Sequence, residues 1–151
     1  FFMKTELGYP SQKYEMAMLD SQRFSHPFNC IEQVSTLNEL ENIQEEIRKV
    51  YVSDLIKNYI HSLVQATREH ADIFLGASPR ASLALYRAGQ AMAAFRSRSF
   101  VIPEDILEVI KPVLIHRIIV KTGARIQELS SSDIIEEIVN NTVVPGGTFS
   151  E

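Results

Sequence analysis

The sequence has no tryptophan and only one cysteine, Cys30, among its 151 residues. A lone cysteine cannot form an internal disulfide, so the composition does not indicate an oxidising compartment. The sequence also lacks a run of 18 apolar residues and a signal-peptide pattern, so neither a membrane span nor a secretory leader is expected. We therefore expect a cytoplasmic chain, whose 45% hydrophobic residues are enough to build a core.

The usual motifs of catalytic centres are missing as well. The phosphate-binding loop G-x-x-x-x-G-K-[ST] and the nucleophile motif G-x-S-x-G are absent. The four histidines do not have the spacing of a zinc site. We expect no complete catalytic centre and no metal site within this chain.

Negative charge is in slight excess, with a formal net charge of -4. Proteins that bind duplex DNA usually depend on a basic surface, so this balance argues against nucleic acid as a partner. One stretch, from Ile73 to Pro103, is nevertheless free of acidic residues. It contains the arginines Arg80, Arg87, Arg96 and Arg98. The stretch is a candidate anion-binding surface, and the alternative is chance clustering on a solvated helix face.

The spacing of apolar residues predicts a mainly α fold, with about five helices in a bundle from Thr36 onward. The expected helices begin near Thr36, Ser53, Pro79, Pro103 and Ser131. Two short β-prone runs, 50–52 and 100–102, are candidates for a small two-stranded ladder.

Two of these helices carry more detailed expectations. In the alanine-rich helix that begins at Pro79, we expect an exposed Arg80 at the first turn. The side chains expected to turn inward are Leu85, Met92 and Phe95. In the helix that begins at Pro103, Pro112 should introduce a kink or a break, because proline lacks the N–H of the helical hydrogen bond. The second part would then contain Ile118 and Ile119 and end at Gly123.

The first residues have a different pattern. Residues 1–7 alternate loosely and are rich in aromatic residues, which predicts a strand, and a helix should follow from Gln12 to about Gln22. A single strand has no partner for its backbone hydrogen bonds. The segment therefore resembles the last part of a sheet-containing domain. We expect its exposed edge to pair with a second chain rather than to fold back.

The segment Gly76-Ala77-Ser78-Pro79-Arg80 is the most concentrated functional signal. Ser78 suits the N-cap and Pro79 the first position of a helix. Arg80 then lies in the first turn, where free N–H groups and the helix dipole favour an anion. Its planar guanidinium matches phosphate oxygens. The segment predicts an anion site, and the alternative is an ordinary helix start with a surface arginine.

Together with Ala81, the same segment resembles the sensor-2 motif of MoxR-family AAA+ ATPases. Other blocks resemble the rest of that family's C-terminal region in the same order, namely 7–15, 51–52, 63–68, 98–106 and 113–118. Their order and spacing make the resemblance specific. Ser97 departs from it, because the family usually has glycine at this position of a turn.

The resemblance implies a domain organisation. Residues 1–24 would be the last strand and helix of a truncated α/β AAA+ core, and 25–35 a linker. Residues 36–144 would be the AAA+ lid domain, and 145–151 a tail.

The resemblance also implies an activity for the parent protein, which would hydrolyse ATP with Mg²⁺. The Walker motifs would precede Phe1, so we expect this fragment to be inactive alone and to hold no cofactor by itself. Arg80 would be the sensor-2 residue that contacts the ATP phosphate. The other residues expected at the nucleotide are Gly76, Ser78, Pro79 and Arg87. For Arg87 a structural salt bridge is the alternative.

The partners implied by the resemblance are the chain's own AAA+ core and neighbouring subunits of a homo-oligomeric ring. Chaperone-like remodelling of partners, among them von Willebrand A-type proteins, would be the outcome. Two other classes stay open. A freestanding helical interaction module without ATP chemistry is weakened by the unpartnered strand, and a helix-turn-helix regulator is disfavoured by the acidic net charge.

Overall fold

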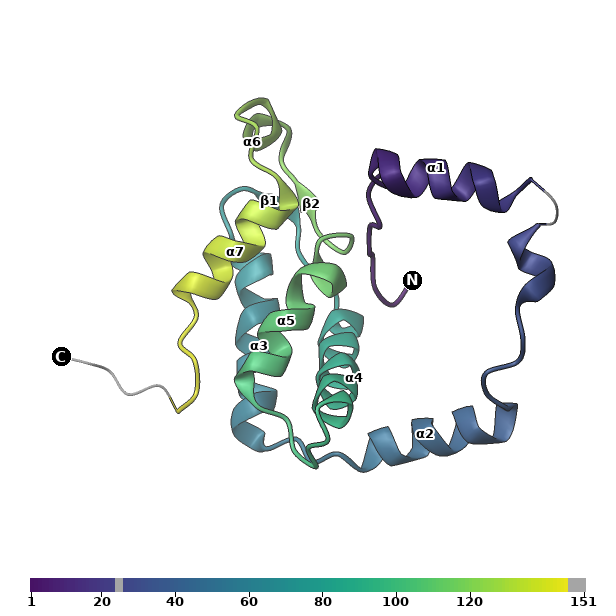
Figure 1. Ribbon diagram of the computed structural model, residues 1–151. Coiled ribbons are helices and arrows are strands. Elements are labelled where there is room, and N and C mark those ends of the chain that lie inside the picture. Colours follow the sequence, from purple (N-terminus) through teal and green to yellow (C-terminus); the bar gives the residue numbers. More distant parts are fainter. Residues whose placement is uncertain (24–25, 147–151) are drawn as a thin grey trace. The chain divides into compact units, whose positions relative to one another are not determined.

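The computed structural model describes residues 1–23 and 26–146 and consists mainly of helices (Figure 1). The chain divides into two compact units, one of Phe1–Lys4 with the chain from Glu45 onward, and one of Thr5–Gln44. The mainly α fold with one small sheet is confirmed. The predicted domain boundaries stay predictions, and the boundary near residue 24 and most of the tail 145–151 lie outside the described residues.

The smaller unit is built from exposed helices. It contains α1 (Gln12–Ser21), the 3-10 turn η1 (Pro27–Cys30) and most of α2 (Leu37–Lys49). The predicted cap of α2 is present, because the Thr36 hydroxyl accepts a hydrogen bond from the Glu39 amide at 3.2 Å and the Glu39 carboxylate accepts one from the Thr36 amide at 2.7 Å. No residue within α1 or α2 is buried, so their apolar faces are not part of the core.

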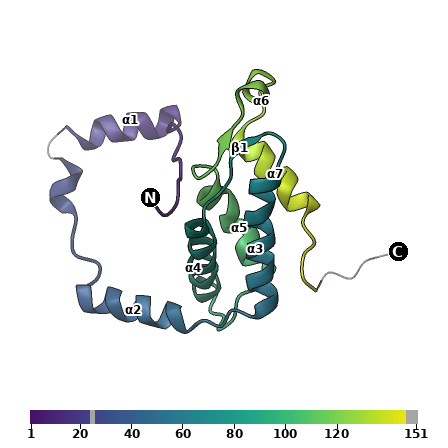
Figure 2. The ribbon, with the colours of Figure 1, turned by 180° about the vertical axis from the view of Figure 1, so that it is seen from behind.

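The larger unit is a helical bundle in which α3, α4 and α5 lie side by side and α7 packs against α3 and α5 (Figures 1 and 2). Its elements are α3 (Asp54–Glu69), β1 (Ile73–Leu75), α4 (Pro79–Phe95), α5 (Pro103–Leu114), β2 (Ile119–Val120), α6 (Thr122–Ile126) and α7 (Ser131–Asn141). The largest fully buried apolar side chains are Leu63, Val64, Leu85, Ile106, Ile110, Val113, Leu114, Ile134 and Ile135.

Small residues bring α4 close to α5. Ala81, Ala84 and Ala88 of α4 are buried. A β-carbon added at Gly89 would lie 2.5 Å from Cδ1 of Ile106, so this position has no room for a larger residue. The alanine-rich sequence therefore sets the helix separation in the bundle.

The small sheet is not where the sequence predicts it. Tyr51 and Phe100 form only one isolated parallel bridge, with the Tyr51 amide donating to the Ser99 carbonyl at 2.9 Å. The two-stranded antiparallel sheet instead joins β1 to β2, with Ile73 opposite Val120. Ile118 to Val120 were assigned to a helix, but these β-branched residues suit a strand equally well once a partner strand is available.

The prediction that the helix splits at Pro112 is wrong, and the predicted kink stays a prediction. Helix α5 continues through Pro112 and ends two residues later, at Leu114. Because Pro112 lies in the last turn, its missing N–H removes one helical hydrogen bond at a place where the helix is ending. Gly123 likewise does not end a helix but lies within the short α6.

The C-terminal end of α4 explains the departure at Ser97. The Ser97 amide donates to the Ala94 carbonyl and the Arg98 amide to the Ala93 carbonyl, both at 2.8 Å, which is the Schellman pattern. Ser97 has a φ of 56°, the left-handed conformation in which glycine is favoured. This ending also leaves Phe95 85% exposed, so the prediction that Phe95 turns inward is wrong, while Leu85 is buried and Met92 partly buried as expected.

Residues 1–7 do not form a strand in this chain, so that prediction is wrong here. The Lys4 amide donates to the carbonyl of Pro112 at 2.8 Å, and the carbonyls of Phe1 and Phe2 accept hydrogen bonds from Arg117. Residues 1–4 therefore fold back onto the end of α5 and the turn after it, although we favoured pairing with a second chain. The described part of the chain offers no neighbouring strand that would complete a ladder.

Candidate functional site

The segment with the strongest sequence signal connects β1 to α4. Pro79 is the first residue of α4, and Arg80 lies exposed in the first turn, as predicted. Ser78 occupies the N-cap position with extended backbone angles, but its side chain makes no capping hydrogen bond. The N-cap position predicted for Ser78 is therefore confirmed, and the Ser78 carbonyl accepts a hydrogen bond from the Ala81 amide at 2.8 Å.

The C-terminal end of α3 holds this connecting segment in place. The Thr67 hydroxyl accepts a hydrogen bond from the Ala77 amide at 2.9 Å and donates one to the Val64 carbonyl at 2.6 Å. Arg68 Nε donates to the Ala77 carbonyl at 2.8 Å. Both polar backbone groups of Ala77 are thus bonded to neighbouring side chains of α3, which fixes the chain three residues before Arg80.

Gly76 is required by this close approach. A β-carbon at position 76 would lie 2.6 Å from the Arg68 Cα and 2.8 Å from the Thr67 carbonyl oxygen, which are backbone atoms that cannot move aside easily. The predicted role of Gly76 at the nucleotide stays a prediction. The structure gives it a positioning role through its contact with α3.

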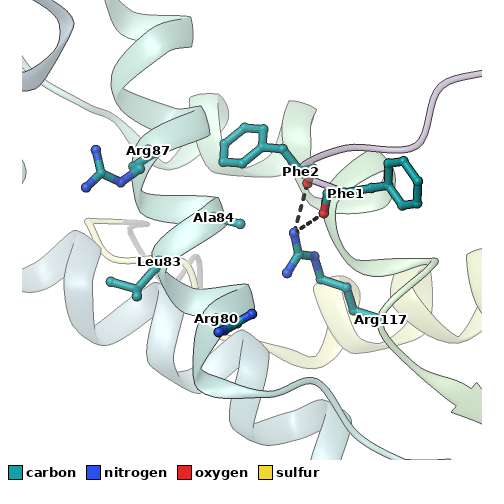
Figure 3. A pocket seen from close by; sticks show the side chains of 7 residues that line it. All are labelled: Phe1, Phe2, Arg80, Leu83, Ala84, Arg87 and Arg117. Atoms are coloured by element: carbon teal, nitrogen blue, oxygen red, sulfur yellow. Dashed lines mark hydrogen bonds between the residues drawn. The ribbon is translucent and has the colours of Figure 1, made fainter. Parts of the chain in front are cut away.

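Arg80 and Arg87 lie along one face of α4, as their spacing of seven residues predicts. Figure 3 shows Ala84 facing Phe1, Phe2 and Arg117, while the Leu83 and Arg87 side chains extend from the other side of α4 in this view. These side chains line an open pocket with a volume of about 420 Å³, and all of its lining residues belong to the larger unit. The lining residues are Phe1, Phe2, Arg80, Leu83, Ala84, Arg87 and Arg117.

The pocket has an uncompensated positive charge. No lining residue is acidic, and in the described part of the chain neither Arg80 nor Arg87 has an ion-pair partner or a side-chain hydrogen bond. The structural salt bridge that was the alternative for Arg87 is thus not found among residues 1–23 and 26–146. An apolar wall beside unpaired guanidinium groups suits an anion that also carries an apolar part.

The other two arginines of the acid-free stretch are neutralised by α5. Arg98 forms a bidentate ion pair with the fully buried Asp105, in which one N–H···O distance is 2.8 Å. Arg96 pairs with Glu108 and lies 3.5 Å from Asp105. The acidic partners of Arg96 and Arg98 lie just after this stretch in the sequence. Of the four arginines in the stretch, only Arg80 and Arg87 therefore keep an uncompensated charge in the fold.

Asp105 is the centre of that network. Burial raises the pKa of its carboxyl, but hydrogen bonds from Arg98 and from the Ile102 amide and the charges of Arg98 and Arg96 more than offset this, so the pKa lies below its usual value. The Ile102 amide donates to the Asp105 carboxylate at 3.0 Å, which also caps α5. The network joins the end of α4 to the start of α5 and is structural.

Sequence reasoning missed Arg117. It lies 37 residues beyond Arg80 in a turn after α5, where the Arg117 amide donates to the Leu114 carbonyl at 2.8 Å. The signal was present, because the block 113–118 resembles the MoxR family, but no role followed from it. The fold brings Arg117 to the same pocket as Arg80.

The described residues contain neither a cluster of metal-binding side chains nor a membrane-spanning helix. Within residues 1–23 and 26–146, no group of three or more His, Cys, Asp or Glu side chains is arranged to hold a metal ion. In the same part of the chain, no helix has the length and apolar character needed to cross a membrane.

Comparisons with known proteins agree with the geometry. The family profile of the AAA lid domain matches residues 65–138. The chain is 37% identical over 145 residues to the uncharacterized protein YeaC of Bacillus subtilis, covering 96% of this chain and 45% of that protein. It is 30% identical over 154 residues to the chaperone MoxR1 of Mycobacterium tuberculosis, covering 96% of this chain and 40% of that protein.

A solved structure extends the comparison to three dimensions. The crystal structure of a putative ATPase from Cytophaga hutchinsonii superimposes with a TM-score of 0.85 at 34% sequence identity, over 95% of this chain and 46% of that one. The chain therefore spans less than half the length of these relatives.

Proposed function

Since this chain is the C-terminal lid region of a MoxR-like AAA+ protein, we propose that it couples ATP binding and hydrolysis in the whole protein to chaperone-like remodelling of partner proteins. The observation that carries this proposal is the environment of Arg80. Arg80 is exposed in the first turn of α4 and has no acidic partner among the described residues. It is therefore available for an anionic ligand.

The local physics favours phosphate at this position. The positive end of the helix dipole lies at the N-terminus of α4, where it favours an anion. The Arg80 guanidinium adds a planar pair of donors that matches two phosphate oxygens. The hydrogen bonds of Ala77 to Thr67 and Arg68 fix the start of α4. The backbone therefore loses little conformational entropy when Arg80 binds a ligand.

The proposed mechanism is a shift between two arrangements of the lid. When bound in the whole protein, ATP supplies a terminal phosphate that is lost on hydrolysis. Arg80 binds that phosphate and stabilises the closed arrangement, and it loses this contact when the phosphate leaves. A ligand shifts such an equilibrium only by its difference in affinity for the two states. Arg87, on the same face of α4, has a secondary role at the nucleotide or at an adjacent subunit.

The partners and cofactors of the proposal belong to the whole protein. ATP and Mg²⁺ are its cofactors, and the lid acts against its own AAA+ core and neighbouring subunits of a homo-oligomeric ring in the cytoplasm. Von Willebrand A-type proteins are the proposed class of remodelled partner. The G-x-x-x-x-G-K-[ST] motif is absent from this sequence, so the 151-residue chain alone should have no ATPase activity and only weak nucleotide affinity.

The test is ATP turnover by the whole protein that contains this chain, with Arg80→Ala. Loss of one charged hydrogen bond to phosphate should lower turnover about 10- to 100-fold with the fold unchanged. The matched control is Arg125→Ala in α6, which removes the same charge from an exposed residue that does not line the pocket. Wild-type turnover in the Arg80→Ala protein would remove Arg80 from the mechanism.

A further inference from the structure

The pocket beside Arg80 contains a third arginine that no sequence motif assigned to a ligand. Arg117 lines the pocket from the side opposite Arg80 and Arg87 (Figure 3). Its Nη2 donates to the carbonyl oxygens of Phe1 and Phe2 at 2.8 and 3.0 Å. Carbonyl oxygens orient a guanidinium but do not neutralise it, so the charge of Arg117 stays in the pocket.

Arg117 also has unused donor capacity. A guanidinium has five N–H donors. The two hydrogen bonds to Phe1 and Phe2 use only Nη2, and the buried Nε has no hydrogen-bond partner in the described part of the chain. A buried donor without a partner is costly unless a ligand or water satisfies it. Nε itself is not accessible, so the donor that Arg117 can offer to a ligand in the pocket is Nη1, which makes no hydrogen bond in the described part of the chain.

We infer that Arg117 is a second phosphate-binding arginine of the lid and that, with Arg80 and Arg87, it makes the pocket a polyphosphate site. This inference rests on the proposed function of the Arg80 site and extends it to a residue from a different element. Three arginines line the pocket and none of its lining residues is acidic, which suits a ligand with several negative charges rather than a single phosphate. Phe2, Leu83 and Ala84 form an apolar side of the pocket.

The ligand chemistry has two sources, a nucleoside triphosphate and free inorganic polyphosphate. Both present a chain of phosphates to the three guanidinium groups. They differ in the base and sugar, which only a nucleotide offers to the apolar side of the pocket. Binding of adenosine, AMP, ATP and inorganic tripolyphosphate to the same chain separates these contributions.

The experiment is an NMR titration of the 151-residue chain with each of these four probes at low salt. Tripolyphosphate and ATP should shift the side-chain Nε–H signals of Arg80, Arg87 and Arg117. AMP should bind about ten-fold more weakly or worse, and adenosine should not bind. An affinity for ATP several-fold above that for tripolyphosphate identifies a nucleotide site, and equal affinities identify a site for the phosphate chain alone. Either result supports the inference.

The variants test Arg117 itself. Arg117→Ala should weaken tripolyphosphate binding about ten-fold, the loss expected for one charged hydrogen-bonding group. Arg117→Lys, which keeps the charge and loses the planar fork, should lose less, about three-fold. Arg125→Ala should bind like the wild type, because it lowers the net charge equally without touching the pocket.

A control spectrum and a second variant distinguish a loss of binding from a loss of folding. Arg117→Ala removes the hydrogen bonds to Phe1 and Phe2, so its backbone amide spectrum must match the wild type away from residues 1–4. Arg87→Ala breaks no side-chain hydrogen bond of the described residues, and it should still weaken binding about ten-fold. Affinities of both variants equal to that of Arg125→Ala would overturn the inference.

The inference and the proposed function fail in different ways. If Arg80→Ala lowers ATP turnover while Arg117→Ala and Arg87→Ala bind tripolyphosphate normally, the polyphosphate site is refuted and the role of Arg80 stands. If all three alanine variants lose tripolyphosphate affinity while Arg80→Ala retains full turnover, the polyphosphate site stands without a role in hydrolysis.

Discussion

Four arginines on α4 and in the turn that follows it have two opposite environments. At the C-terminal end, Arg96 and Arg98 pair with Glu108 and the buried Asp105 of α5. Arg80 in the first turn and Arg87 at the middle of the helix have no acidic partner among the described residues and line a pocket of about 420 Å³. The same residue type on one helix is thus structural where the fold supplies a carboxylate and available to a ligand where it does not.

The comparison predicts where substitutions should affect stability and where they should affect function. Changes to the C-terminal network should lower the free energy of unfolding. Changes to Arg80 and Arg87 should leave it nearly unchanged and alter phosphate binding instead. The expected effects below run from the largest to the smallest.

Asp105→Ala should have the largest effect on stability. It removes the buried partner of Arg98 and the acceptor for the Ile102 amide. Breaking a buried ion pair typically costs about 3 kcal/mol or more, because the remaining charge is left uncompensated. Urea denaturation of the chain measures this loss. A loss below about 1 kcal/mol would show that the network contributes little.

The pH dependence of stability gives a second measurement on Asp105. Its pKa in the folded chain lies below the usual value, so its stabilising contribution is complete above the pKa of the unfolded chain. That contribution is lost as the pH falls from the unfolded pKa through the lower folded pKa. Denaturation at neutral and at strongly acidic pH should therefore show a smaller acid-induced loss for Asp105→Asn than for the wild type.

Thr67→Val should combine a moderate stability loss with a functional defect. It leaves the buried Ala77 amide without its acceptor, which should cost about 2 kcal/mol. Because Ala77 fixes the start of α4, ATP turnover by the whole protein should also fall although Arg80 is present. Thr67→Ser retains the hydroxyl and serves as the control. Equal turnover in the two variants would mean that the hydrogen bond between Thr67 and Ala77 does not position Arg80.

Ser97→Gly should increase stability by about 1 kcal/mol, because a residue with a β-carbon is strained at a positive φ of 56°. The substitution lies at the structural end of α4, so phosphate binding at the pocket should not change. The thermal midpoint of the chain measures the effect. A lower midpoint for Ser97→Gly would mean that the Ser97 side chain stabilises the turn by more than its strain costs.

Arg87→Ala should have the smallest effect on stability, within about 0.5 kcal/mol. Its exposed side chain has no hydrogen bond or ion pair within the described residues. The matched comparison is Arg98→Ala, which should destabilise the chain clearly because it leaves Asp105 buried without its bidentate partner. Equal losses from Arg87→Ala and Arg98→Ala would break the contrast between the two environments.

The sequence predicted the helices well and their packing partners less well. The starts of α2, α4, α5 and α7 followed from capping residues and proline, which are local signals. The sheet of β1 and β2 could not be predicted in the same way, because it pairs residues 73 and 120, which are far apart in sequence. The effect of Pro112 depended on where α5 ends, which the tertiary structure decides.

The part of the candidate site that lies on α4 could be predicted from the sequence, and the part contributed by other elements could not. Arg80 and Arg87 lie on one helix, so their spacing gave their common face. The place of Arg117 in the pocket and the hydrogen bond between Thr67 and Ala77 depend on contacts between separate elements, which the sequence does not predict. The charge pattern alone did not distinguish Arg80 from Arg98, since the partner of Arg98 lies outside the acid-free stretch.

The most direct test of the contrast is the ATP turnover number of the whole protein with Arg80→Ala, measured beside its thermal midpoint. Removal of an arginine that serves only the ligand should lower turnover about 10- to 100-fold and leave the midpoint unchanged. Wild-type turnover in this variant, or a fall in turnover that is matched by unfolding, would contradict the assignment of the N-terminal end of α4 to phosphate binding.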